Sequence, residues 1–526
     1  MEETLPELDY LVIGAGPAGL QMGHHLQQAG RDYLIVEAGA APGTFFSKFP
    51  RHRQLISINK VYTGWDDPEL NLRMDWNSLL AGPLFKEYTQ RFFPAADDMV
   101  RYLGDFAATQ GLSVQYDTRI ERISRPDGFE AVDQHGNVLR ARRLIVATGV
   151  SKPYVPAIPG IETAELYSEM STDPADFTNQ RVLIIGKGNS AFETADNLIE
   201  HAAVIHVAGP HSLRLAWQTH FLGHLRAVNN NFLDTYQLKS QNAILDGNVV
   251  DIARQSDSSY LVTVSFSRAD EVTKDIRYDR VLVATGFRFD ASILDPECRP
   301  NLAINDRFPA QTSAWESINV PDLYFAGTIT QERDFKKSTS AFIHGFRYAT
   351  RALHRVLEQR HHGQDWPHRE LAGSAGKVGA AILERVNRTS ALWQLFGFIG
   401  DVVTLSADGS ARYWEELPVD FVADAVAAGL LGEVDTYLVI TLEYGKDHDR
   451  LDPFDINARR IAQSDAEHAL DGRYLHPVVR QYRIDGQIAE HHITENLENE
   501  WTQETVHRKP LVDFLDTALR APEPMR

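Results

Sequence analysis

The chain has 526 residues, of which 43% are hydrophobic, and its 52 basic and 72 acidic side chains give a formal net charge of −20 at pH 7. A chain of this length accommodates two or three domains with substantial cores. The negative charge argues against a nucleic acid or an anionic membrane as a partner. Cys298 is the only cysteine, which excludes an internal disulfide, a two-cysteine redox centre and a disulfide reductase.

No stretch reaches about 18 uninterrupted apolar residues, and residues 1–6 have neither a basic start nor an apolar core. Residues 523–526 carry no retention tetrapeptide. We therefore expect a cytoplasmic protein with no membrane attachment. Cys298, in the irregular segment 295–300, is interpreted as an inert small side chain.

A glycine-rich turn, Gly14-Ala-Gly-Pro-Ala-Gly19, follows the apolar run at residues 10–13. In such a turn the first glycine permits a sharp bend, the second lets the backbone approach a pyrophosphate, and the third lets the helix pack close to the strand. The next predicted strand, 33–36, is followed by Glu37, whose carboxylate is placed to accept hydrogen bonds from a ribose. The predicted contacts of this first dinucleotide are Gly14, Gly16, Pro17, Ala18, Gly19 and Glu37.

A second turn of the same kind, Gly186-Lys-Gly-Asn-Ser-Ala191, follows the apolar run at residues 182–185. The strand after it, 204–207, ends without an acidic residue, and the next charged groups are His211 and Arg214. A missing carboxylate and a nearby guanidinium favour a ribose with a 2′-phosphate, hence NADPH over NADH. The predicted contacts are Gly186, Gly188, Asn189, Ser190, Ala191, His211 and Arg214.

Each turn is followed later by a hydrophobic strand that ends in Ala-Thr-Gly, at 147–149 and 284–286, which adds Thr148, Gly149, Thr285 and Gly286 to the cofactor contacts. A return segment, 323–327, ends at Gly327, and a helix is expected at about 338–358. Ser338 or Thr339 is expected to cap that helix, whose N-terminus would stabilise a reduced, anionic flavin with help from Lys336 or Lys337.

The predicted fold is α/β, with two interleaved Rossmann-like domains and a C-terminal α+β domain. We assign residues 1–165 and 290–360 to the first dinucleotide-binding domain, with an aromatic-rich insertion at about 44–95, and residues 166–289 to the second, NADPH-binding domain. In the NADPH domain, the strand at 259–266 is expected to close on the strand at 278–286.

Residues 371–526 are predicted to form a separate accessory domain after a polar linker at 360–368. Its expected elements are a helical stretch at about 374–400, a helix at about 418–430, and strands at 437–444 and 478–484. No metal is expected, because adjacent histidines such as His361-His362 and His491-His492 point to opposite faces of a strand. This domain is expected to cover the flavin pocket, to contact substrate or to form a homodimer interface.

Several longer sequence runs, in addition to the two glycine turns, resemble a known protein family. They include Pro50-Arg-His-Arg-Gln-Leu-Ile-Ser-Ile-Asn-Lys60, Asp75-Trp-Asn-Ser78, Asp98-Met-Val-Arg-Tyr-Leu-Gly-Asp-Phe106, Asp234-Thr-Tyr-Gln-Leu-Lys-Ser240, Phe342-Ile-His-Gly-Phe-Arg-Tyr348 and, near the C-terminus, Leu475-His-Pro477 and His491-His-Ile493. In these runs the chain resembles the FAD-dependent oxidoreductases of the flavin-containing monooxygenase family, and most of all a eukaryotic endoplasmic-reticulum subgroup of it.

The resemblance implies FAD on the first turn, NADPH on the second, and a flavin C4a-hydroperoxide that transfers one oxygen atom from molecular oxygen to a small metabolite. Oxygenation of nitrogen or sulfur is preferred over Baeyer–Villiger chemistry. The alternatives are an NADPH oxidase or dehydrogenase of the same fold, and a flavin-stabilised adaptor protein.

The family places an asparagine close to the flavin, and Asn59 is the nearest match, with Ser57 as the alternative. Lys60 and Arg53 are candidates to neutralise a hydroperoxide or an acidic substrate, and Trp76 with Asn77 to wall the flavin. The predicted catalytic set is Asn59, Lys60, Lys337 and Gln331, with His344 as a further candidate; Arg53, Trp76, Gly327 and Ser338 are predicted cofactor contacts.

Two departures from the family pattern matter. The fingerprint Phe-x-Gly-x-x-x-His before the second turn is absent, with Tyr167 where the histidine is expected, and the flavin loop Gly-Gly-x-Trp reads Pro42-Gly-Thr-Phe-Phe46. Both departures make Baeyer–Villiger chemistry the less favoured branch.

Overall fold

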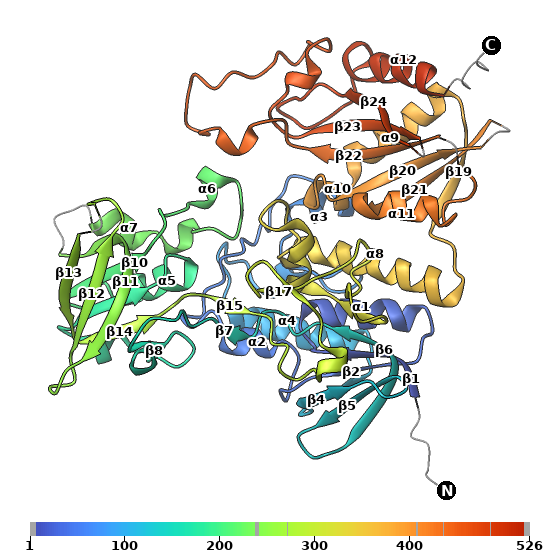
Figure 1. Ribbon diagram of the computed structural model, residues 1–526. Coiled ribbons are helices and arrows are strands. Elements are labelled where there is room, and N and C mark those ends of the chain that lie inside the picture. The colour runs from blue at the N-terminus through green and yellow to red at the C-terminus, as the bar shows by residue number, and fades with distance from the viewer. Residues whose placement is uncertain are drawn as a thin grey trace, which may run out of the picture.

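The computed structural model describes residues 7–236, 241–270, 272–406, 409–434, 436–483 and 485–519. They form a mixed α/β structure with two Rossmann-like sheets and a third, antiparallel sheet near the C-terminus (Figure 1). Residues 1–6 and 523–526, used for the expected localisation, and residues 237–240, part of one family run, lie outside the described residues.

The first sheet has the strand order β3-β2-β1-β6-β5-β4, with β18 paired to β6. Its strands are β1 (Glu7–Ile13), β2 (Tyr33–Val36), β3 (Val114–Gln115), β4 (Ile120–Ser124), β5 (Phe129–Asp133), β6 (Val138–Val146) and β18 (Leu323–Phe325). β1 runs parallel to β2 and β6, and its last four residues are buried, as the apolar run at its end predicts. Because β18 comes from the return segment, the first domain is built from two separate parts of the chain.

Helices cover this sheet: α1 (Pro17–Gln28), α4 (Ala96–Thr109) and α8 (Ile343–His362), with α1 packed against α8. The insertion between β2 and α4 contains the short helices α2 (Thr44–Lys48) and α3 (Pro68–Met74) and much irregular chain. Asp67 caps α3 by accepting a hydrogen bond of 2.8 Å from the backbone N–H of Glu69.

Helix α8 begins at Ile343, five residues later than expected, so the prediction that Ser338 or Thr339 caps it is wrong. The Ser338 hydroxyl donates to the Asp334 carboxylate instead, and the Thr339 hydroxyl donates to the Gln394 carbonyl at 2.7 Å. The segment before the helix is a 3₁₀ stretch, η6 (Gly327–Asp334), followed by loop. The two hydroxyls are therefore used within the loop and between domains.

The second sheet has the order β13-β12-β11-β10-β9-β14-β8. Its elements are β8 (Glu165–Leu166), β9 (Arg181–Ile185), α5 (Asn189–Leu198), β10 (Val204–Gly209), α6 (Ala216–Thr219), α7 (Asn231–Tyr236), β11 (Ala243–Arg254), β12 (Tyr260–Phe266), β13 (Thr273–Tyr278) and β14 (Arg280–Val283). The short strands β7 (Lys152–Pro153) and β15 (Phe287–Arg288) pair antiparallel where the chain passes between the two domains.

The expected closure of strand 259–266 on strand 278–286 is wrong in part. β12 pairs with β11 and with β13, which ends at Tyr278, whereas β14 pairs in parallel with β9 and β8 at the other side of the domain. The sequence run therefore holds two strands with Asp279 between them. A parallel β14 beside β9 brings the Ala-Thr-Gly end of the run next to the second glycine turn.

The C-terminal domain is an antiparallel sheet of order β19-β21-β20-β22-β23-β24 with helices around it. Its elements are β19 (His368–Ala372), α9 (Ala375–Arg388), α10 (Ala391–Gln394), β20 (Ile399–Leu405), β21 (Ser410–Pro418), α11 (Val419–Ala427), β22 (Thr436–Glu443), β23 (His476–Arg483), β24 (Gly486–His492) and α12 (Lys509–Ala518). The predicted helix near 418–430 and both predicted strands are present as α11, β22 and β23.

The expected helical stretch 374–400 breaks after Arg388, and its last residues belong to β20. Gly397 has a φ of +68°, which a helix does not allow, and the β-branched residues Ile399, Val402 and Val403 suit a strand. The short strands β16 (Leu302–Ala303) and β17 (Phe308–Pro309) complete the described strands.

The C-terminal domain lies over α8 rather than apart from the rest of the molecule (Figure 1). One hydrophobic core runs from α1 and α8, through Trp366 in the linker, into the C-terminal sheet. Residues 360–362 of the expected linker are the end of α8, which stops at Gly363 with a φ of +64°. The domain is therefore packed on the first domain through a shared core.

Candidate functional site

The first glycine turn has the geometry of a phosphate cradle. A Cβ on Gly14, whose φ is +105°, would lie 2.9 Å from the Ala147 carbonyl oxygen, and one on Gly19 would lie 1.9 Å from that of Gly14. Gly16 has no atom within 4 Å of the same position, so its side faces open space. Helix α1 starts there with Pro17 and without a side-chain cap or an acidic residue in its first turn. Its positive end is thus free for an anion.

Glu37 lies at the tip of β2 and is buried beside this cradle. Its Oε2 accepts a hydrogen bond of 2.8 Å from the Ala15 N–H, and its Oε1 accepts bonds from the Gly39 N–H at 2.9 Å and the Thr44 hydroxyl at 2.8 Å. Three donors hold the carboxylate in place, and each oxygen keeps lone pairs for a ribose. Together with the open side of Gly16, this arrangement fits the adenosine diphosphate half of FAD.

The second turn repeats the cradle. A Cβ on Gly186, whose φ is +126°, would lie 2.2 Å from the Ala284 carbonyl oxygen, whereas Gly188 again has nothing within 4 Å. Helix α5 also starts without a side-chain cap. Ala191 is fully buried, and Ser190 lies in the first turn of α5.

Asn189 uses its side chain to hold a loop of its own domain. Its amide nitrogen donates to the carbonyls of Gly223 and His224 at 3.2 and 2.9 Å, and its Oδ1 accepts from the Arg226 N–H at 3.1 Å. The loop 221–226 is thereby fixed against the N-terminal end of α5.

The expected 2′-phosphate residues, His211 and Arg214, are both exposed after β10. Sequence reasoning missed two further cations here. Lys187 Nζ donates to the His211 carbonyl at 3.0 Å and pairs with Asp246 at 2.5 Å, and Arg268 pairs with the same carboxylate at 3.1 Å. Lys187 lies inside the second glycine turn, so its position in the sequence could have indicated a role near the nucleotide. Nothing in the sequence indicates that Arg268 lies nearby.

The two Ala-Thr-Gly ends present bare backbone to the cradles. Gly149 and Gly286 have positive φ and no atom near an added Cβ, and the Thr285 hydroxyl donates to the Tyr154 carbonyl at 2.5 Å. Thr148 is half-buried. Gly327, whose φ is +81°, lies against α1: a Cβ there would be 2.8 Å from that of Ala18.

An aromatic stack stands where the insertion meets the start of α8. The rings of Trp76 and His344 are 5.0 Å apart at 17°, and those of His344 and Phe342 are 5.7 Å apart at 9°. Two groups of the second domain face this stack: Arg226 lies 5.3 Å from the Trp76 ring, and the Phe221 ring lies 5.9 Å from Phe342. Both nucleotide domains therefore contribute to one centre.

His344 is buried, and burial lowers its pKa to about 3, so the ring is neutral at physiological pH. Its Nδ1 lies 3.3 Å from the Trp76 carbonyl, whereas its Nε2 is buried without a hydrogen-bond partner among the described residues. A buried ring nitrogen without a partner fits a site that a bound ligand completes.

The remaining predicted catalytic residues are not joined to one another by any hydrogen bond or ion pair of the described chain. Asn59 is buried and donates to the Thr89 carbonyl at 2.8 Å, and Gln331 is buried in η6. Lys60 is exposed, with Nζ 3.7 Å from the Met74 sulfur, and Lys337 is exposed.

The neighbouring candidates of the insertion bind one another or the chain nearby. The Ser57 hydroxyl donates to Asn77 Oδ1 at 2.6 Å, and the Asn77 amide donates to the Ile58 carbonyl at 3.0 Å. Arg53 pairs with Asp97 at 2.5 Å. The roles of all these residues remain predictions.

A contact between the domains was also missed. The Arg51 N–H donates to the Tyr167 hydroxyl at 3.1 Å, that hydroxyl donates to the buried Glu193 carboxylate of α5, and the Phe49 ring stacks 5.8 Å from Tyr167. Burial raises the pKa of Glu193 to about 7. Tyr167, which replaces the family histidine, thus fastens the insertion to the second nucleotide helix.

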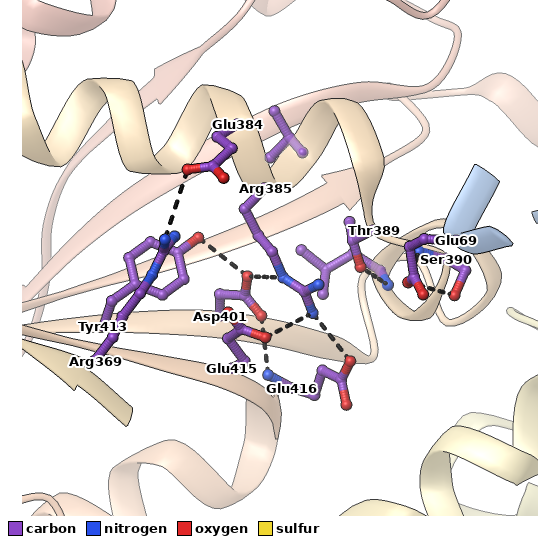
Figure 2. A network of polar contacts seen from close by, with 12 residues as sticks. Glu69, Arg369, Glu384, Arg385, Thr389, Ser390, Asp401, Tyr413, Glu415 and Glu416 are labelled. Carbon is purple, nitrogen blue, oxygen red and sulfur yellow. Dashed lines mark hydrogen bonds and ion pairs between the residues drawn. The ribbon is translucent and has the colours of Figure 1, made fainter. Parts of the chain in front are cut away.

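The C-terminal domain is held on the first domain by a buried charge network (Figure 2). Arg385 binds Asp401 at 2.9 Å and Glu416 at 3.0 Å, and Asp401 also accepts from the Tyr413 hydroxyl at 3.0 Å. Arg351 and Arg355 of α8 reach the same Glu416 at 2.6 and 3.2 Å. A polar cavity of about 280 Å³ opens beside this network, lined by Glu69, Arg369, Glu384, Arg385, Arg388 and Glu415.

The same domain reaches the second nucleotide domain through an aromatic ring contact. His448 lies 4.1 Å from His220, at the end of α6, and 4.1 Å from Tyr444. The two histidine pairs have partners of other kinds. His361 and His362 lie 2.9 and 2.8 Å from tyrosine hydroxyls of the first sheet. The His491 ring stacks 5.3 Å from that of Phe514, and His492 Nδ1 lies 2.8 Å from His476 Nε2. Across the described ranges, no group of three or more histidine, cysteine, aspartate or glutamate side chains is arranged to hold a metal ion.

Cys298 is buried, and burial raises the pKa of its thiol to about 11, so it is not a thiolate at neutral pH. In the part of the chain that the structure describes, no helix has both the length and the apolar character that crossing a bilayer requires.

Two Rossmann-like sheets with open phosphate cradles define a dinucleotide-dependent oxidoreductase. The model of the pyridine nucleotide-disulphide oxidoreductase family matches residues 11–327, and the chain belongs to this family of FAD-dependent oxidoreductases. The FAD-dependent oxidoreductase domain-containing protein 2 of Mus musculus is 39% identical over 98% of this chain and 84% of its own length. Its counterpart in Danio rerio is 37% identical over 97% and 83%. The predicted resemblance is confirmed.

Among solved structures, a flavin-containing monooxygenase from Stenotrophomonas maltophilia superposes with a TM-score of 0.52 at 23% identity. The superposition covers 67% of this chain and 98% of that one. At this identity the likeness concerns the fold.

Proposed function

We propose that the protein is an NADPH-dependent FAD monooxygenase that oxygenates a small metabolite, with nitrogen or sulfur as the preferred acceptor. The observation that carries the proposal is the pair of equivalent cradles in one chain, with Gly16 and Gly188 both open to a diphosphate. The overall reaction consumes NADPH, a proton, molecular oxygen and the substrate, and yields NADP⁺, water and the oxygenated product.

Bound FAD would accept hydride from the nicotinamide and pass the electrons to oxygen. This chain's own residues bind and shield. The amide groups at the start of α1 and the Glu37 carboxylate would hold the adenosine diphosphate half. Trp76, Phe342 and the neutral His344 would exclude water from the reacting centre, and His344 Nε2 is available for a hydrogen bond.

The chain gives no support to disulfide reduction, the chemistry in the family's name. Cys298 is the only cysteine, it is buried, and its pKa is raised to about 11. An NADPH oxidase is the second candidate, because Tyr167 stands where the family fingerprint has its histidine, and its hydroxyl is bound to Glu193 at the domain boundary.

The test is a stoichiometry. Flavin-loaded protein is given NADPH and a panel of amines and sulfides, and NADPH consumed is compared with hydrogen peroxide released. A monooxygenase releases much less peroxide than the NADPH it consumes when its substrate is present, and forms oxygenated product to match. If all the NADPH consumed is recovered as hydrogen peroxide with every compound, the protein is an NADPH oxidase. If no NADPH is consumed, the result favours a flavin-stabilised adaptor protein.

A further inference from the structure

Basic side chains gather where the two nucleotide domains meet. We call them the interdomain cation cluster, and they are Arg214, Arg288, Arg307 and Lys336. They come from four segments: the loop after β10, strand β15, the turn before β17 and the loop after η6. No motif of the sequence predicts that they lie together.

Backbone contacts bring these segments to the boundary. The Phe289 N–H, next to Arg288, donates to the Arg307 carbonyl at 3.0 Å. The Arg214 carbonyl accepts from the Leu225 N–H at 3.1 Å, in the loop whose Phe221 ring packs on Phe342 of the first domain.

Aromatic rings, not carboxylates, lie beside three of these cations, Arg288, Arg307 and Lys336. Lys336 Nζ and Arg307 Cζ lie 5.0 and 6.0 Å from the centre of the same ring, that of Phe335. Arg288 lies 4.0 Å from the Tyr154 ring. Within the described residues none of the four cations has a carboxylate oxygen within 4 Å, and Arg307 Nε is buried without a hydrogen-bond partner.

The cations also feel one another. Burial lowers the pKa of Lys336, and the charges of Arg214 and Arg307 lower it further. Burial lowers the pKa of His224 to about 4, again with Lys336 and Arg214 contributing, and its Nε2 is buried without a partner. Repulsion among these cations, together with the partial burial of Arg288 and Arg307, costs free energy that a bound anion would offset.

We propose that the interdomain cation cluster is an oxyanion site that both domains build. The inference rests on the proposed function and extends it, because the oxyanion has two possible sources: the diphosphate of NADPH, or an acidic group of the substrate. Arg288 follows Gly286 of the second cradle by two residues, and Arg214 lies on the loop after β10, so the nucleotide is the favoured source. Lys336 and Arg307 would then add first-domain contacts to it.

The test uses flavin-loaded protein and calorimetric titration with inorganic pyrophosphate and with NADP⁺. The variant R307Q/K336Q removes two cluster cations, and R254Q/K274Q removes two exposed cations on β11 and β13, with the same change in net charge. Pyrophosphate affinity should fall about tenfold or more in the first variant and change by less than about twofold in the second. Flavin content verifies folding, and the single variant K336Q, at an exposed loop position, repeats the test where packing is unaffected.

Competition separates the two sources. If NADP⁺ displaces pyrophosphate, the nucleotide supplies the oxyanion; if pyrophosphate binds alongside NADP⁺, the substrate supplies it, and both results support the site. Absence of pyrophosphate binding to the parent protein, or equal losses in the two double variants, overturns the inference. Cluster-dependent pyrophosphate binding by a protein that neither binds NADP⁺ nor is reduced by NADPH would refute the proposed function and leave the oxyanion site standing.

Discussion

The glycines of each turn differ in the space available for a Cβ atom, and this difference indicates why each position is glycine. Gly14, Gly19 and Gly186 are required by the protein itself, since a Cβ at each would collide with backbone. Gly16 and Gly188 have free space around the missing Cβ and backbone angles that any residue adopts. At the head of a helix, close approach of a diphosphate accounts for glycine at the latter two positions.

Replacing Gly16 by valine should therefore remove the flavin without unfolding the protein. The valine side chain would fill the space that a diphosphate needs, and flavin content should fall about tenfold or more while the far-UV spectrum stays unchanged. Flavin absorbance per protein at purification is the measurement. Gly376→Val, at an equally open position in α9, is the control and should keep its flavin. Equal flavin content in both would place the cofactor elsewhere.

Glu193 should make stability depend on pH. Burial raises its pKa in the folded state to about 7 from an ordinary 4.5, so its stabilising effect is complete below about 4.5 and is lost as the pH rises through about 7. Glu193→Gln removes the titration. The difference in unfolding free energy between parent and variant should shift by up to about 3 kcal/mol in favour of the variant between pH 5 and 8. Urea titrations at several pH values measure the unfolding free energies of parent and variant. If the two free energies change with pH in the same way, the raised pKa of Glu193 is contradicted.

At the scale of elements, the sequence predicts what apolar periodicity controls. The strands around both glycine turns, helix α11 and strands β22 and β23 appear near their expected positions, because a parallel strand or an amphipathic helix leaves a local pattern. Two boundaries differ from the prediction. The start of α8 depends on the partners that Ser338 and Thr339 find in the folded chain. The change from helix to strand before β20 depends on one left-handed glycine, Gly397.

Glu416 connects elements of two domains, since Arg351, Arg355 and Arg385 all bind it, and they hold its pKa far below the usual range. Glu416→Gln should leave the largely buried guanidinium groups of Arg351 and Arg355 without a counter-charge, and Arg385 with Asp401 as its nearest carboxylate, and destabilise the protein by about 3–5 kcal/mol. Thermal and denaturant unfolding measure this. Its neighbour Glu415 is 37% exposed and 3.6 Å from Arg385, so Glu415→Gln is the control and should cost much less. Similar losses would mean that the network does not hold the domains together.

For the whole molecule, sequence reasoning located the two glycine turns but not the contacts between domains. Each cradle is a short run of chain, and its glycines stand close together in the sequence. Other contacts depend instead on how distant segments pack. Examples are the ion pair of Arg268, the contact of Arg51 with Tyr167, and the proximity of Arg288 to Arg307. From the sequence, the C-terminal domain was expected to be a separate module. In the structure this domain shares a hydrophobic core with α8.

The C-terminal domain contacts the second nucleotide domain at His448, whose ring lies 4.1 Å from that of His220, beside the loop that faces Trp76. If this contact holds residues 216–226 in place, His448→Ala should speed amide hydrogen exchange in those residues and leave the C-terminal sheet protected. Mass spectrometry of exchange measures it. His468→Ala is the control, because His468 is exposed and binds only Asp465 of its own loop. Unchanged exchange at 216–226 in the His448 variant would show that this loop is held from within its own domain, through Asn189.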